Sequence, residues 1–216
     1  MPSKDENSQP DTGGRKKLNT PNKLSLSRIL LTPFMALFMV PISRYYSTGG
    51  WNRFVAREGL IIALLIFIIG AVTDFFDGHL ARKSGVVTNT GKLLDPIADK
   101  ILILTAMAGF VQLGEIHTFI FMLVLLREFG VTFLRLVAVE RGQVIAASKA
   151  GKWKTGLQIA MIIVLFLKLI LRAYAAPALL VTIFAYAATI LLILTVLVAT
   201  VSGVEYFIRN RQVWED

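Results

Sequence analysis

Residues 74–99 form the most informative stretch of this 216-residue chain, DFFDGHLARKSGVVTNTGKLLDPIAD. It holds two pairs of aspartates at fixed spacing, in the pattern D-x2-D-G-x2-A-R-x8-G-x3-D-x3-D. Residues three and four apart share a helix face. The first half therefore predicts a helix face that carries Asp74, Asp77, Gly78, Ala81 and Arg82. The second half predicts a face of another helix that carries Gly91, Asp95 and Asp99.

Four carboxylates that meet in one pocket repel one another unless cations lie between them. Hard oxygen ligands of this kind favour Mg²⁺ or Mn²⁺. Two such ions about 3.5–4 Å apart can hold both the attacking and the leaving oxygen of an in-line phosphoryl displacement. The small residues of the pattern leave room for a bulky group, such as a nucleotide. We therefore predict a site for two divalent ions on Asp74, Asp77, Asp95 and Asp99.

The composition is that of an integral membrane protein. Apolar residues make up 55% of the chain and the mean hydropathy is +0.65, whereas soluble domains have roughly 45–50% apolar residues. About 20 apolar residues span a bilayer, and such stretches lie at 24–43, 58–80, 93–114, 116–139, 156–175 and 178–207. The predicted fold is an all-α bundle of six transmembrane helices over residues 23–208, between a polar, disordered tail (1–22) and a short tail (209–216). The chain has no cysteine, which excludes disulfides and Cys-based zinc sites.

The net charge of +9 fits a membrane better than a nucleic acid, because the basic residues fall between the apolar stretches. Eighteen of the 23 lysines and arginines fall on the side of the predicted membrane that holds both termini and the aspartate pattern. The five on the opposite side are Arg44, Arg53, Arg57, Lys168 and Arg172. By the positive-inside rule, both termini and the aspartate pattern are expected to face the cytoplasm.

The aspartate pattern resembles the signature of the CDP-alcohol phosphatidyltransferases, membrane enzymes that displace CMP from a CDP-linked lipid with an alcohol. The resemblance covers about residues 21–207. It implies a homodimer whose active site opens to the cytoplasmic leaflet of a bacterial cell membrane. It also implies that Asp99 is the catalytic base as well as a metal contact.

The segment PNKLSLSR at residues 21–28 resembles the P-N-x-L-T-x-x-R opening of the same family, with Ser25 in place of the more usual Thr. Asn22 could instead cap the helix, and Arg28 could reach lipid headgroups. The resemblance places the cytidine diphosphate against Asn22, Arg28, Gly78, Ala81, Arg82 and Gly91.

Two further segments, REFGVTFLR at 127–135 and IAASKAGKWKT at 145–155, resemble the R-E-x-x-V-T-x-x-R and I-A-A-S-x-x-G-K-x-K-T segments of bacterial phosphatidylglycerophosphate synthases. A dianionic acceptor such as glycerol 3-phosphate needs a cationic pocket. The resemblance implies that this pocket holds Arg127, Arg135, Ser148, Lys149, Lys152 and Lys154. Two other interpretations are open. Glu128 and Arg135 share a helix face and could form an internal ion pair, and each lysine could bind anionic headgroups with about 1 kcal/mol.

The resemblance implies transfer of a phosphatidyl group from CDP-diacylglycerol to glycerol 3-phosphate, giving phosphatidylglycerophosphate and CMP in phospholipid biosynthesis. An alternative acceptor is inositol phosphate, or phosphatidylglycerol as in a cardiolipin synthase. A cation transporter could also place carboxylates in the membrane, but it would not require the Gly and Ala spacings of the pattern.

Overall fold

The computed structural model describes residues 20–42, 49–84, 89–142 and 149–213, and the side chains of 26–42, 49–73, 100–142 and 153–213. The described residues are helical, with no strand among them. The polar tail predicted for residues 1–22 falls outside the described side chains. The helices are α1 (Thr20–Met39), α2 (Gly49–Phe54), the π-helical turn η1 (Val55–Gly59), α3 (Leu60–Ser84), α4 (Asn89–Gln112), α5 (Thr118–Glu140), α6 (Lys149–Ala173), α7 (Ala178–Arg209) and the 3-10 turn η2 (Arg211–Val213).

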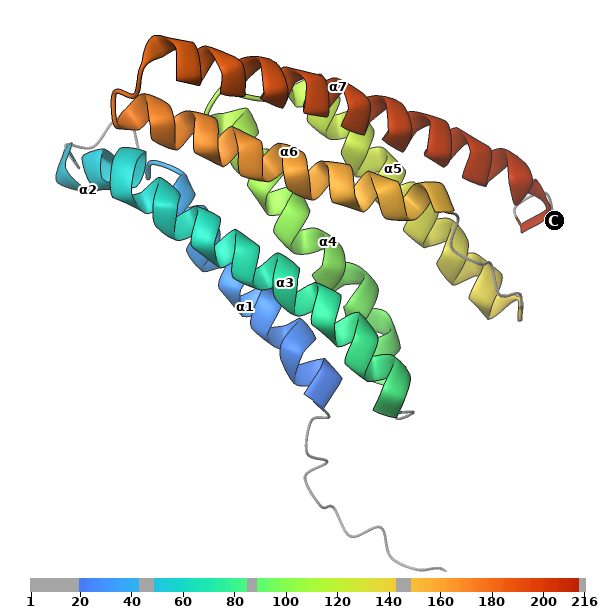
Figure 1. Cartoon of the computed structure of the whole chain (residues 1–216). Coiled ribbons are helices and arrows are strands. Elements are labelled where there is room, and N and C mark those ends of the chain that lie inside the picture. The colour runs from blue at the N-terminus through green and yellow to red at the C-terminus, as the bar shows by residue number, and fades with distance from the viewer. Residues whose placement is uncertain (1–19, 43–48, 85–88, 143–148, 214–216) are drawn as a thin grey trace, which may run out of the picture.

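The long helices alternate in direction along the chain (Figure 1). As a result α1, α4 and α6 begin at the end of the bundle where α3, α5 and α7 finish. One group of contacts joins α1 with α3 and α4, and another joins α7 with α5 and α6. Helix α4 contacts α5, and helix α6 contacts α3, so these two helices connect the groups. The aspartate positions of α3 and α4 are therefore at the same end as the start of α6.

The main core is apolar and lies between α1, α3, α4 and α6. Its largest buried side chains include Phe67, Phe110 and Phe166, one from each of α3, α4 and α6. The rings of Phe110 and Phe166 meet edge to face, with centroids 4.9 Å apart, a favourable geometry for aromatic pairs. A second, smaller apolar cluster joins α5 to the end of α7 around Leu134 and Tyr206.

Three helices are long and apolar enough to cross a membrane among the described residues: Gly49–Thr73, Trp153–Ala173 and Ala178–Arg209. In α7, large apolar side chains such as Ile190, Leu197 and Val201 are more than half exposed. A continuous apolar surface of this kind is suited to lipid rather than to water. This is a membrane protein. The other three predicted spans coincide with α1, α4 and α5, and their crossing of the membrane stays a prediction.

The structure extends the second predicted span toward the N-terminus, because α2, η1 and α3 follow one another without a break from Gly49. Here η1 lies directly against α1. A Cβ atom built on Gly59 would be 2.5 Å from the carbonyl oxygen of Phe38. Glycine at this position therefore permits the close contact of two backbones.

We expect Gly59→Ala to destabilise the fold by about 1–3 kcal/mol, because the added methyl group requires a backbone shift. A matched control is Gly156→Ala in α6, where an added Cβ meets nothing within 4 Å and alanine is the better helix former. Thermal unfolding in detergent, followed by tryptophan fluorescence, compares the two. Equal midpoints for both variants would contradict the contact at Gly59.

Candidate active site

The carboxylate of Glu128, on α5, is the centre of a buried cluster of charges. Its side chain is 4% exposed and is within reach of cations from α4, α5 and α6. Lys154 Nζ forms an ion pair and hydrogen bond with Oε1. Arg127 Nη1 lies 3.3 Å from the same oxygen, and Lys100 Nζ lies 3.7 Å from Oε2. Three cations around one carboxylate leave an excess of positive charge, which is costly in a membrane protein and makes this cluster a candidate functional site.

Lys154 is itself buried, with 6% of its surface exposed, close to the start of α6. A lysine is rarely buried without a partner, and Glu128 supplies one. Lys154 is one of the residues that we predicted to bind the acceptor, and the structure places it inside the cluster. Anchoring to headgroups is therefore not the role of this lysine.

Lys100, the residue after Asp99, reaches from α4 to α5. Its Nζ donates to the backbone carbonyl of Glu128, 3.1 Å away, and to the hydroxyl of Thr132. The Thr132 hydroxyl in turn donates to the same carbonyl over 2.8 Å. One lysine thus joins two helices through backbone, hydroxyl and carboxylate oxygens.

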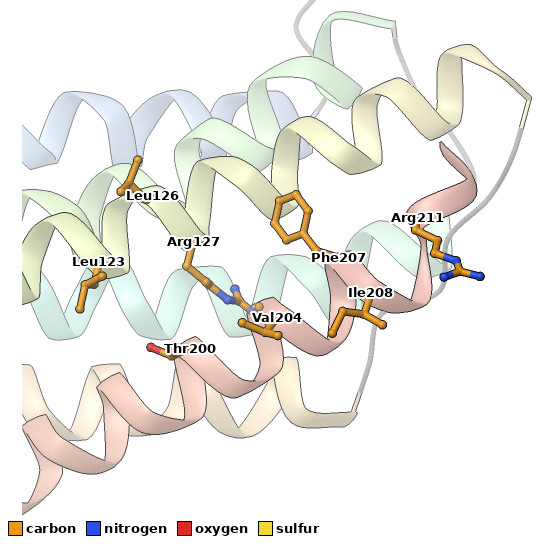
Figure 2. Close-up of a pocket in the computed structure, with 9 residues that line it drawn as sticks. Leu123, Leu126, Arg127, Thr200, Val204, Phe207, Ile208 and Arg211 are labelled. Atoms are coloured by element: carbon orange, nitrogen blue, oxygen red, sulfur yellow. The ribbon is translucent and has the colours of Figure 1, made fainter. Parts of the chain in front are cut away.

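Arg127 connects the cluster to α7, where its Nη2 donates to Ser202 Oγ over 3.0 Å. Gly203 makes room for it, since a Cβ there would be 2.8 Å from Arg127 Cγ. The same arginine borders a pocket of about 570 Å³ between α5 and α7. Figure 2 shows Arg127 extending beside Val204, with Phe207 pointing toward α5 and Arg211 near the end of α7.

Arg135 lies two turns after Glu128 on α5, but its partner is a residue of α7. Its Nε donates to the hydroxyl of Tyr206 over 3.1 Å, and its guanidinium carbon is 5.6 Å from the centre of that ring. The internal pair between Glu128 and Arg135, one of the interpretations of the sequence, is wrong. Glu128 binds cations of α4 and α6 instead, because those lysines reach its carboxylate across the helix interfaces.

The aspartate positions lie in α3 and α4 beyond the side chains that the structure describes. A described contact between α3 and α4 is that of Gly70 with Leu102, where a Cβ on Gly70 would be 2.6 Å from Leu102 Cδ2. Positions 74 and 77 follow Gly70 by four and seven residues. Positions 99 and 95 precede Leu102 by three and seven residues. Helical periodicity therefore predicts all four on the faces through which these antiparallel helices touch.

Among the described side chains there is no group of three or more His, Cys, Asp or Glu residues that could hold a metal ion. Of the predicted nucleotide-binding residues, Arg28 is described, and it is 3% exposed on α1. Besides the four aspartates, the predicted site residues that lie outside the described side chains are Asn22, Gly78, Ala81, Arg82, Gly91, Ser148, Lys149 and Lys152.

Sequence reasoning did not predict Lys100, Thr132, Ser202 or Tyr206 as members of the site. Lys100 counted only as one more cytoplasmic charge. A signal was present, since Lys100 is adjacent to the aspartate pattern and Thr132 belongs to the REFGVTFLR segment. Their partnership joins residues 32 positions apart, and helical spacing says nothing about such distances.

Comparisons with known proteins identify the family of this chain. The model of the CDP-alcohol phosphatidyltransferase family matches residues 18–201. The chain is 39% identical over 208 residues to a Bacillus subtilis protein named CDP-diacylglycerol--glycerol-3-phosphate 3-phosphatidyltransferase, covering 91% of this chain and 96% of the relative. It is 38% identical over 205 residues to a Mycobacterium tuberculosis protein named "Probable phosphatidylglycerophosphate synthase", covering 93% and 88%.

A Treponema pallidum protein with the same name as the Bacillus protein is 38% identical over 133 residues, 61% of this chain and 60% of the relative. The family match runs from the start of α1 through most of α7 and includes both the aspartate pattern and the cluster around Glu128. The chain belongs to the CDP-alcohol phosphatidyltransferase family.

Proposed function

We propose that this protein transfers the phosphatidyl group of CDP-diacylglycerol to glycerol 3-phosphate and releases CMP. The observation that carries the acceptor assignment is the excess positive charge around Glu128, where Lys100, Arg127 and Lys154 share one carboxylate. A dianionic phosphate offsets such an excess, and an uncharged alcohol does not. The names of the Bacillus and Treponema relatives support the same acceptor.

Members of this family generally depend on divalent cations. Aspartate oxygens suit Mg²⁺ or Mn²⁺, and the four pattern positions continue the touching faces of α3 and α4, which fits a shared site. We propose that Asp74, Asp77, Asp95 and Asp99 hold two such ions. When bound, they offset the negative charge of the pyrophosphate.

In this proposal, the residues of the chain bind both substrates and move one proton. The cytidine diphosphate lies against the pattern residues Gly78, Ala81, Arg82 and Gly91, with Asn22 and Arg28 of α1. Asp99 accepts the proton of the acceptor hydroxyl. That oxygen forms a bond to the phosphorus nearer the lipid, and the bond from this phosphorus to the CMP oxygen breaks. The acceptor phosphate is held by Arg127, Arg135, Ser148, Lys149, Lys152 and Lys154.

The cellular setting completes the proposal. The protein is a homodimer in a bacterial cell membrane, crosses it six times and opens its site to the cytoplasm, where glycerol 3-phosphate is present. The family match favours a transferase over a cation transporter. Inositol phosphate and phosphatidylglycerol are the acceptors that a test must exclude.

The direct test is release of radiolabelled CMP from CDP-diacylglycerol by the purified protein, with each acceptor added separately. Glycerol 3-phosphate should support the fastest release, and the lipid product should be phosphatidylglycerophosphate by mass. Omission of Mg²⁺ and Mn²⁺ in the presence of EDTA should stop the reaction. Faster release with inositol phosphate or phosphatidylglycerol would overturn the acceptor assignment and leave the family membership intact.

Arg135 is the clearest residue for testing the acceptor pocket, because it is exposed and not part of the Glu128 ion pairs. We expect Arg135→Gln to raise the KM for glycerol 3-phosphate about tenfold to hundredfold, since a hydrogen bond to a charged group is worth roughly 1.5–3 kcal/mol. The KM for CDP-diacylglycerol should change little. We expect the same split for Lys149→Gln and Lys154→Gln.

The control is Arg209→Gln, which removes an exposed arginine at the end of α7 and should leave both KM values unchanged. Steady-state kinetics with each substrate varied separately provide the measurement. Equal increases of both KM values in Arg135→Gln would exclude a specific role in acceptor binding.

A further inference from the structure

Lys100 has a place in the structure that a surface charge would not have. It follows directly after Asp99 in α4, and its side chain is 25% exposed. The ammonium group contacts α5 in three ways: through the Glu128 carbonyl at 3.1 Å, the Thr132 hydroxyl, and the Glu128 carboxylate at 3.7 Å. Two of the three donors of the ammonium group therefore form hydrogen bonds to α5, and its charge also pairs with the Glu128 carboxylate.

The contacts of Lys100 join two parts of the proposed site. The Glu128 carboxylate that it approaches also binds Lys154 and Arg127, which belong to the proposed acceptor pocket. Adjacent residues of a helix are offset by about 1.5 Å along its axis. A side chain that fixes α4 at residue 100 therefore also fixes the axial position and rotation of α4 at residue 99.

We propose that Lys100 is a positioning residue that holds α4 against α5 and so keeps the carboxylate of Asp99 in register with the hydroxyl of the bound acceptor. This inference rests on the proposed function. Lys100 does not touch substrate in this role and acts through the helix that carries Asp99. A misplacement of reacting groups by about 1 Å can reduce a rate about hundredfold, so the expected effect falls on turnover rather than on substrate affinity.

The test compares Lys100→Met, which keeps an unbranched side chain and removes all three donors, with Lys100→Arg, which keeps donors. In Lys100→Met, kcat is expected to fall about tenfold or more, while both KM values change less than about threefold. Lys100→Arg should retain most of the wild-type kcat. The matched control is Lys168→Met, which breaks the partly buried ion pair between Lys168 and Glu115 at the opposite end of the bundle. This control should leave kcat unchanged.

A second measurement reads the position of α4 without activity. Because the chain has no cysteine, single cysteines at the exposed positions Ala108 and Phe133 can carry spin labels on α4 and α5. Lys100→Met should shift or broaden the distance distribution between the labels, and Lys168→Met should not. Thr132→Val should also lower kcat, and the double variant Lys100→Met/Thr132→Val should be no slower than Lys100→Met alone.

Several outcomes overturn the inference. If Lys100→Met keeps its kcat within twofold of the wild type, or leaves the distance distribution unchanged, Lys100 does not position α4. If it raises only the KM for glycerol 3-phosphate, Lys100 is a ligand of the acceptor phosphate. Absence of CMP release by the wild type with every acceptor would instead refute the proposed function, so the two failures are distinguishable.

Discussion

Asp99→Asn should abolish phosphatidyl transfer while the protein stays folded and inserted in the membrane. Asparagine has nearly the same volume as aspartate, so the fold of α4 is preserved, but the amide cannot accept the proton of the acceptor hydroxyl. General-base catalysis contributes about 10²–10⁴-fold to a rate, and the weakened metal site adds to the loss. We therefore expect turnover to fall at least about hundredfold at saturating Mg²⁺.

The measurement is CMP release under single-turnover and steady-state conditions, with elution profile and thermal midpoint as checks of folding. Glu140→Gln is the matched control, because Glu140 is an exposed carboxylate at the end of α5. It should keep the wild-type rate and stability. Turnover by Asp99→Asn close to that of the wild type would exclude Asp99 as the base.

The fold was largely predictable because apolar length and helical periodicity are local properties of the chain. The predicted spans 93–114 and 116–139 coincide closely with α4 (Asn89–Gln112) and α5 (Thr118–Glu140). The extension of α3 backward to Gly49 was missed, because residues 49–57 are too polar to be assigned to a span by hydropathy. The structure shows that this segment packs on Phe38 of α1 through Trp51 and Phe54.

The candidate site was only partly predictable, and the reason is the distance along the chain between its members. Helical spacing grouped Glu128 with Arg135, since both lie on one face of α5. The observed partners of Glu128 include Lys100 and Lys154, which are 28 and 26 residues away. No local pattern contains such contacts. The site on the aspartate pattern stays a prediction, and the contact of Gly70 with Leu102 lies one turn from positions 74 and 99.

A further large effect should follow from Glu128→Gln, because it leaves the ammonium group of Lys154 buried without its anion. Loss of one partner of a buried ion pair typically costs about 3–5 kcal/mol. Both side chains are well buried, at 4% and 7% exposure. The substitution also leaves Lys100 and Arg127 without a neutralising carboxylate. We expect a large fall in the thermal midpoint and in the free energy of unfolding in detergent.

The design that separates charge imbalance from simple loss of contact is the double variant Glu128→Gln/Lys154→Met. It removes both members of the pair, so no buried ammonium group lacks its counter-ion, and replacement of a buried pair by neutral groups is often close to neutral in stability. The double variant should therefore recover much of the stability that Glu128→Gln loses, while its acceptor use stays poor because Lys154 is absent. Glu115→Gln, at the opposite end of the bundle, serves as the control for loss of a partly buried carboxylate that pairs with a single lysine. It should cost less stability than Glu128→Gln, since only one cation loses its partner. If Glu128→Gln proves as stable as the wild type, or if the double variant is the less stable of the two, the buried carboxylate does not balance the cations around it, and the electrostatic account of this site is wrong.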